Sequence, residues 1–186
     1  MTLLSLSTRA LEASCAAVAL VTPADLSRPT PCGDWTLSQL IGHMVAHNRG
    51  WTLAASGQPA DGSVWDDLSL PSSDFAASCS AVTAAFAACS LERLDVYGYG
   101  QLSLSTALRM HVVDYVIHGW DVAASLGMPF SVDEDLAVSA FDIMKTFPDR
   151  PRPTPAFGVK VPVPATASSL DQFLGYVGRD PAWRAT

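Results

Sequence analysis

Apolar side chains recur at intervals of three and four residues through most of the chain, which is the period of helices that bury one face. The clearest repeat lies in residues 72–90, and the side chains that share its face are Phe75, Cys79, Val82, Phe86 and Cys89. Patterns of this kind, bounded by turn residues, predict four main helices. They are residues 2–21, 37–56, 72–90 and 102–126, with a fifth helix at residues 131–147.

Helix-start signals support two of these boundaries. Thr36 can cap the helix that begins at residue 37, while Gln39 returns a hydrogen bond, which is a capping box. Ser131 and Glu134 have the same spacing and predict a capping box for the fifth helix. Gly57, followed two residues later by a proline, predicts the end of the second helix.

The composition changes at Pro148. Residues 148–164 hold six prolines and are therefore expected to be extended or looped. Ser168 and Asp171 then predict a short last helix that ends at Gly178. The segment at residues 92–101 is expected to be irregular or briefly extended. The predicted fold is all-α: a four-helix bundle with an additional helix and a proline-rich C-terminal segment that ends in a short helix.

Composition and charge narrow the classes of function. The 186 residues suit one domain spanning residues 1–186, with the proline-rich segment at 148–186 as its extension. There are 11 basic and 18 acidic residues, a net charge of −7, which disfavours binding to nucleic acid or to anionic membranes.

The chain also lacks the apolar segments that targeting or anchoring would need. No apolar run reaches the roughly 20 residues of a membrane span. Arg9 and Glu12 interrupt the apolar N-terminal stretch, so a helix is expected there and not a signal peptide. The four cysteines are scattered and are interpreted as small buried residues in a reducing compartment, which predicts a cytoplasmic protein.

All four histidines fall on two of the predicted helices. The second helix carries His43 and His47, and the fourth carries His111 and His118 with Asp114 between them. Asp114 and His118 lie one turn apart on the same side of their helix, and His111 lies close to that stripe. A carboxylate and an imidazole at this spacing can hold one metal ion together with a third ligand from a facing helix.

The same residues also fit a purely structural cluster. Asp114 could pair with Arg109 or with His118, because ion pairs also gather polar groups in bundles. No glutamate follows His43, so the H-E-x-x-H mechanism is excluded. No dinucleotide loop, G-x-S-x-G elbow or P-loop occurs, and no sequence neighbour activates a cysteine. From the residues alone, the metal site and the structural cluster both stay open.

Three stretches resemble a known family. Thr30-Pro-Cys-Gly-Asp-Trp-Thr is followed by Leu40-Ile-Gly-His43, and His118-Gly-Trp-Asp-Val-Ala is preceded by a carboxylate four residues earlier. Both resemble signatures of the N-terminal domain of mycothiol-dependent maleylpyruvate isomerase and its actinobacterial relatives, which belong to the DinB-like superfamily. The tail, with Gly178-Arg-Asp-Pro-Ala-Trp, resembles a largely uncharacterised subgroup of that superfamily.

The resemblance implies a DinB-like four-helix bundle that binds one divalent ion. The implied ligands are His43, Asp114 and His118, and zinc or nickel is the expected ion. Aspartate stands where the isomerase has glutamate, and its shorter side chain implies a weaker or closer site. His47 and His111 have no counterpart in the family pattern.

The resemblance also implies a metal-dependent enzyme that uses a low-molecular-weight thiol such as mycothiol for thiol transfer or for isomerisation of a small electrophile. The isomerase has a separate C-terminal domain with no counterpart in this sequence, so maleylpyruvate is not carried over as substrate. The expected partner is a small-molecule substrate or thiol, and pairing into a homodimer is common in the family. The alternative is a non-enzymatic metal- or ligand-binding stress-response module. Trp120 is expected to pack in the bundle, and Asp121 to hold a neighbouring loop or a histidine.

Overall fold

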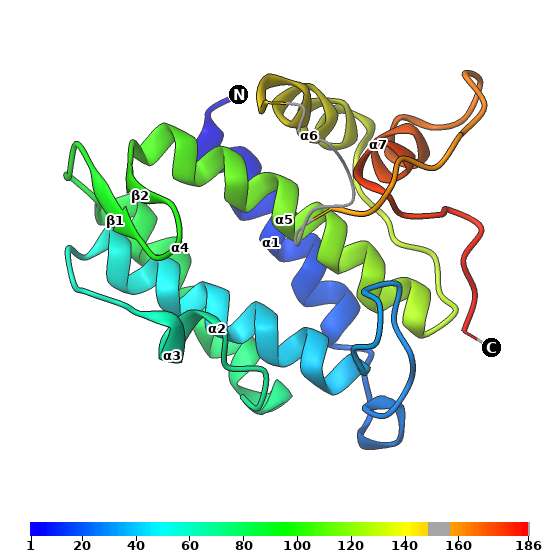
Figure 1. Ribbon diagram of the computed structural model, residues 1–186, viewed down its shortest axis with the longest axis horizontal. Coiled ribbons are helices and arrows are strands. Elements are labelled where there is room, and N and C mark those ends of the chain that lie inside the picture. The colour runs from blue at the N-terminus through cyan, green and yellow to red at the C-terminus, as the bar shows by residue number, and fades with distance from the viewer. Residues whose placement is uncertain (149–156, 186) are drawn as a thin grey trace.

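The computed structural model describes residues 1–148 and 157–185, and four long helices form its bundle (Figure 1). They are α1 (Leu3–Val18), α2 (Leu37–Ala55), α4 (Phe75–Ala88) and α5 (Leu104–Ser125). α1 lies along α5, which crosses in front of it in Figure 1, while α2 packs on both α4 and α5. The predicted all-α bundle is confirmed.

Shorter elements surround the bundle. They are two 3₁₀ turns, η1 (Pro23–Asp25) and η2 (Ser72–Asp74), and the helices α3 (Gly62–Trp65), α6 (Glu134–Thr146) and α7 (Ser169–Val177). The strands β1 (Leu94–Val96) and β2 (Gly100–Leu102) form an antiparallel hairpin. α6 packs on α5 and α7 packs on α6, so the C-terminal part of the chain lies against one side of the bundle (Figure 1).

Two of the three predicted helix starts are confirmed. The Thr36 side chain accepts from the Gln39 amide, and Gln39 returns the bond, so the capping box of α2 is present. Ser168 caps α7 as expected. The capping box predicted for the fifth helix is wrong: α6 begins at Glu134 with no side-chain cap. The Glu134 carboxylate instead accepts from a serine hydroxyl of α7, so a tertiary contact takes the group that the local cap would need.

Other boundaries differ by a few residues. The long helix α5 begins at Leu104 because Leu102 completes the hairpin, which confirms the brief extended segment expected before it. The short helix α3 was not predicted. Residues 149–156 of the proline-rich segment lie outside the described residues, while residues 157–164 have no regular secondary structure, as expected.

Two glycines permit close approaches that set the geometry of the bundle. A Cβ atom on Gly119 of α5 would lie 2.6 Å from the Ser14 hydroxyl of α1 and 2.6 Å from the Phe130 ring. A Cβ atom on Gly50 of α2 would overlap the Trp65 indole of α3. Larger side chains at these positions would push α1 off α5 and α3 off α2.

α5 is the central helix of the fold. From position 111 to position 125 every residue except Asp114 is buried. A helix that is buried all round must find partners for its polar side chains inside the protein. Despite this burial, no helix among the described residues has both the length and the apolar character required to cross a membrane.

Candidate metal centre

α2 and α5 bring three histidines and one aspartate together. His43 and His47 come from α2, with ring centroids 3.8 Å apart, and the His118 ring of α5 lies 5.1 Å from that of His43. The two Asp114 oxygens divide between neighbours: Oδ1 is 3.4 Å from His118 Nε2, and Oδ2 is 3.4 Å from His47 Nδ1. The three residues predicted as ligands therefore lie in one cluster with His47. Within it, the ligand atoms of His43, His47 and Asp114 all lie within 4.8 Å of one another, while His118 contacts the group through Asp114.

Two tryptophans cover the histidines of α2. The Trp35 ring lies 4.9 Å from that of His43, and the Trp65 ring meets His47 edge-on at 5.3 Å. Burial lowers the pKa of His43 well below its ordinary value, and the neighbouring imidazoles of His47 and His118 lower it further. His43 is thus held neutral, which is the form of imidazole that binds a metal ion.

Asp114 and His118 form the charged part of the cluster. Burial alone would raise the pKa of Asp114, but the charges and hydrogen bonds of His118 and His47 hold it well below its ordinary value. Burial alone would lower the pKa of His118, but Asp114 and then Asp121 raise it well above its ordinary value. A carboxylate therefore faces an imidazolium, and the Asp114 side chain keeps 29% of its surface exposed, which leaves the cluster open on one side.

The other ring nitrogen of His118, Nδ1, is hydrogen-bonded to a buried carboxylate on the side away from Asp114. His118 Nδ1 lies 3.0 Å from Asp121 Oδ2, and the Asp121 side chain is fully buried. Arg179, which follows α7, donates from Nε to Asp121 Oδ1 at 2.8 Å and from Nη2 to Oδ2 at 3.1 Å. A carboxylate on the far nitrogen fixes the tautomer and orientation of a metal-binding histidine. Nε2 of His118 is accordingly the nitrogen directed at Asp114.

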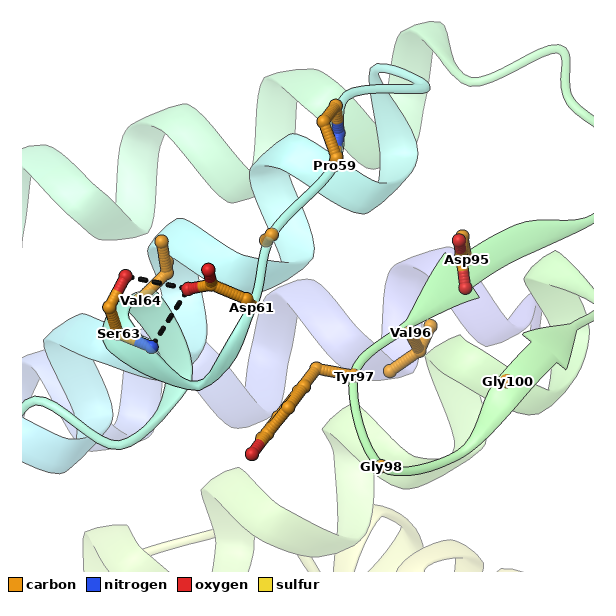
Figure 2. A pocket seen from close by; sticks show the side chains of 10 residues that line it. Pro59, Asp61, Ser63, Val64, Asp95, Val96, Tyr97, Gly98 and Gly100 are labelled. Atoms are coloured by element: carbon orange, nitrogen blue, oxygen red, sulfur yellow. Dashed lines mark hydrogen bonds between the residues drawn. The ribbon is translucent and has the colours of Figure 1, made fainter.

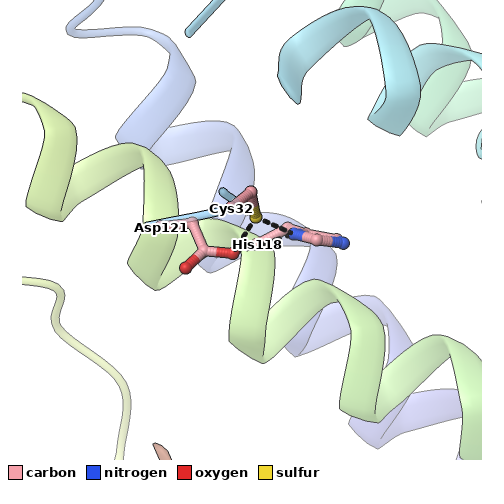
Figure 3. A group of neighbouring side chains, drawn as sticks. All are labelled: Cys32, His118 and Asp121. Carbon is pink, nitrogen blue, oxygen red and sulfur yellow. Dashed lines mark hydrogen bonds and ion pairs between the residues drawn. The ribbon is translucent and has the colours of Figure 1, made fainter. Parts of the chain in front are cut away.

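Cys32 completes this support. Its Sγ lies 2.9 Å from Asp121 Oδ2 and 3.7 Å from His118 Nδ1 (Figure 3), and Arg179 donates to it at 3.0 Å. Cys32, His118 and Asp121 have the spacing of a metal site, but the adjacent guanidinium would repel a cation. Burial and the Asp121 charge raise the pKa of Cys32. The group therefore orients His118, and the prediction of an apolar buried cysteine is wrong here.

The remaining polar residues of α5 lie apart from the cluster. His111 is fully buried, its Nδ1 lies 2.9 Å from the Ser7 hydroxyl, and burial lowers its pKa to about 3. Arg109 contacts the Thr146 hydroxyl at 3.5 Å and not Asp114, so the alternative pairing of Asp114 with Arg109 is wrong. The other alternative, pairing of Asp114 with the histidine one turn away, is present.

Sequence reasoning missed two contributors to the site. His47 was compatible with a ligand by its spacing from His43 but had no counterpart in the family pattern. Arg179 lies within the tail that resembles the family subgroup, but nothing in the sequence linked it to Asp121. The expectation that Asp121 holds a loop or a histidine is confirmed for both. Trp120 is buried as expected, but it packs with residues of α5 and α7, outside the main core.

A hollow lies elsewhere, between the chain before α3 and the hairpin (Figure 2). Tyr97 projects from the hairpin toward the turn that carries Asp61 and Ser63. Asp61 accepts from both the amide and the hydroxyl of Ser63, so its carboxylate is occupied in capping α3. None of the clustered histidines lines this hollow, and it is not part of the candidate site.

Comparison with known proteins identifies relatives and a family. Two uncharacterised proteins of Mycobacterium tuberculosis, from strains CDC 1551 and H37Rv, are each 28% identical over 178 residues, which cover 92% of this chain and 94% of theirs. No solved structure matches significantly. The mycothiol maleylpyruvate isomerase N-terminal domain family matches residues 7–123, a span that holds the whole histidine–aspartate cluster, and the chain belongs to that family.

Proposed function

We propose that His43, Asp114 and His118 hold one divalent metal ion, zinc or nickel. The observation that carries the proposal is the orientation of His118, whose Nδ1 is held by a buried carboxylate while Nε2 faces Asp114. Two imidazoles and one carboxylate suit zinc, nickel or iron and do not suit calcium, which prefers oxygen ligands alone. Three ligands on two rigid helices leave positions open for water or a small molecule.

The charge of the cluster fits a cation. His43 is held neutral, Asp114 is held ionised, and the proton on His118 is the one charge that an ion must displace. Binding is therefore expected to release this proton, and affinity is expected to fall as the pH falls.

His47 is assigned the role of orienting Asp114. Its Nδ1 lies 3.4 Å from Asp114 Oδ2, while Oδ1 of the same carboxylate faces His118. One oxygen would therefore be held by His47 and the other would be left for the ion. Trp65 packs on the outer side of His47 and limits the positions its ring can take.

We further propose that the centre serves a metal-dependent enzyme that uses a low-molecular-weight thiol of the mycothiol type. A bound ion would lower the pKa of a coordinating thiol and supply a thiolate at neutral pH. Around it, Trp35 packs on His43 and Trp65 packs on His47, and the partly exposed Asp114 marks the open side. The reaction would be thiol transfer to, or isomerisation of, a small electrophile in the cytoplasm, where such thiols are kept reduced.

A non-enzymatic metal- or ligand-binding role in a stress response is the second candidate. The observation that favours it concerns the neighbouring polar groups. His47, Asp121 and Cys32 all contact the proposed ligands and are engaged in holding them. None of the three is left as a general acid or base for a substrate.

Metal analysis of the purified protein tests the site. His43→Ala and His118→Ala are each expected to abolish stoichiometric metal, while the matched variant His47→Ala should keep most of it. Metal that survives the first two changes would refute the site. An assay for turnover of generic electrophiles with mycothiol then distinguishes the two proposed functions. Turnover that needs both metal and thiol supports the enzyme. Stoichiometric metal without turnover supports the binding module.

A further inference from the structure

Two cysteines from different helices meet outside the cluster of proposed ligands. Cys15 of α1 and Cys79 of α4 are 64 residues apart in the chain, yet their Sγ atoms lie 3.0 Å apart. Cys15 is half-buried and can be reached from solvent, while Cys79 is buried with 6% of its surface exposed. Both are free thiols, so the contact is one between two reduced cysteines.

We propose that Cys15 and Cys79 form an oxidisable pair that closes to an intramolecular disulfide between α1 and α4 when the protein meets the disulfide form of a low-molecular-weight thiol. A disulfide bond is about 2.05 Å long, so the two sulfur atoms must approach by only about 1 Å. Side-chain rotation and a small shift of either helix supply a movement of that size. The inference does not depend on the metal centre or on the proposed function.

The environment assigns a different role to each thiol. Contact with Cys79 lowers the pKa of Cys15, and Cys15 is also the more exposed of the two. The hydrogen bond with Cys15, together with burial, raises the pKa of Cys79. Since the small disulfide must reach the attacking sulfur, the more exposed Cys15 reacts first and the buried Cys79 resolves the mixed disulfide.

The exchange balances without any further reactant. The Cys15 thiolate attacks one sulfur of the small disulfide, whose S–S bond breaks, and one small thiol leaves with the proton that Cys15 gave up. Cys79 then loses its proton and attacks the Cys15 sulfur, and the second small thiol leaves with that proton. The protein loses two electrons and two protons, and the small disulfide becomes two thiols.

The other two cysteines are placed for different contacts. The Cys32 sulfur lies against Asp121 and Arg179, and its pKa is raised by burial. Cys89 follows the last turn of α4. A bridge between positions 15 and 79 would close a loop that contains all of α2, and closing a loop of this length restricts the unfolded chain.

The test treats the full chain with oxidised glutathione, blocks the remaining thiols and maps peptides without reduction. The expected product is one peptide pair that links Cys15 to Cys79, with the mass of two hydrogens lost. The bridged protein should melt roughly 5–10 °C higher than the reduced protein, because the unfolded chain is restricted. Cys89→Ser, a matched change of a third thiol, should form the same bridge.

Single changes of the pair test the assigned roles. Cys79→Ser or Cys79→Ala should accumulate a stable mixed disulfide at Cys15, whereas Cys15→Ser should react at position 79 at least about tenfold more slowly because that thiol is buried. The wild-type map tests the bridge even if a variant at the buried position fails to fold. The proposal is overturned if the wild-type chain keeps a stable mixed disulfide at Cys15, forms no linked peptide, or oxidises first at Cys32 or Cys89.

Discussion

Arg179→Met isolates the support that the C-terminal segment gives to the proposed metal centre. The change removes the guanidinium from Asp121 while keeping much of the apolar length of the side chain. Asp121 is fully buried and would keep only His118 and Cys32 as partners. Removing one partner of a buried ion pair typically costs about 3–5 kcal/mol of stability.

Protonation of the carboxylate limits that cost. A pH of 7 is about three units above the ordinary Asp pKa, so protonating the Asp121 carboxylate costs about 4 kcal/mol at most. The penalty of the variant cannot exceed this value, because the carboxylate would otherwise bind a proton. At pH 5 the same limit is about 1.5 kcal/mol. The penalty of Arg179→Met should therefore shrink by about 2–3 kcal/mol between pH 7 and pH 5. In the wild type Arg179 and His118 hold the pKa of Asp121 below its ordinary value, so that carboxylate stays ionised across this range.

Urea unfolding at pH 5, 6 and 7, with chelator present, measures this difference. The matched control is Arg184→Met, which removes an arginine of the same segment whose side-chain hydrogen bonds among the described residues go to backbone carbonyls. Metal titration of the same proteins should show affinity reduced by about 10–100-fold for Arg179→Met only, because His118 loses its fixed orientation. A penalty that stays constant from pH 5 to pH 7 would show that Arg179 acts by packing alone and would refute the reasoning.

Three further outcomes are expected. Burial lowers the pKa of His111 to about 3, so below pH 6.5 the unfolded chain binds a proton that the folded chain does not, and the free energy of unfolding falls by up to about 1.4 kcal/mol per pH unit. His111→Phe should remove this contribution to the pH dependence of urea unfolding. An unchanged pH dependence would contradict the conclusion that His111 is buried in its neutral form. Gly119→Ala should lower the free energy of unfolding by about 1–3 kcal/mol, because the added Cβ would overlap Ser14 and Phe130. A melting temperature equal to that of the wild type would show that α1 and α5 can move apart to admit the methyl group without loss of stability. The net charge of −7 predicts no binding to duplex DNA by fluorescence anisotropy at physiological ionic strength, and salt-sensitive binding there would contradict it.

Local chemistry was enough to predict the four long helices of the bundle from the sequence alone. Helical period and end signals act within about four residues, so Thr36 with Gln39 and Ser168 with Asp171 mark their helix starts without any tertiary information. The same short range placed Asp114 and His118 on one side of α5. The resemblance to the family then paired them with His43, and the structure brings these three residues into one cluster.

Contacts between distant segments were decided only by the tertiary structure. Arg179 reaches Asp121 across 58 residues because α7 docks beside α5, and the Cys15–Cys79 contact depends on how α1 packs on α4. In the same way, the Glu134 side chain accepts a hydrogen bond from a serine of α7 and does not form the predicted capping box. Such contacts leave no periodic trace in the sequence, since they are selected by the packing of whole helices, which depends on the volume and shape of many side chains together.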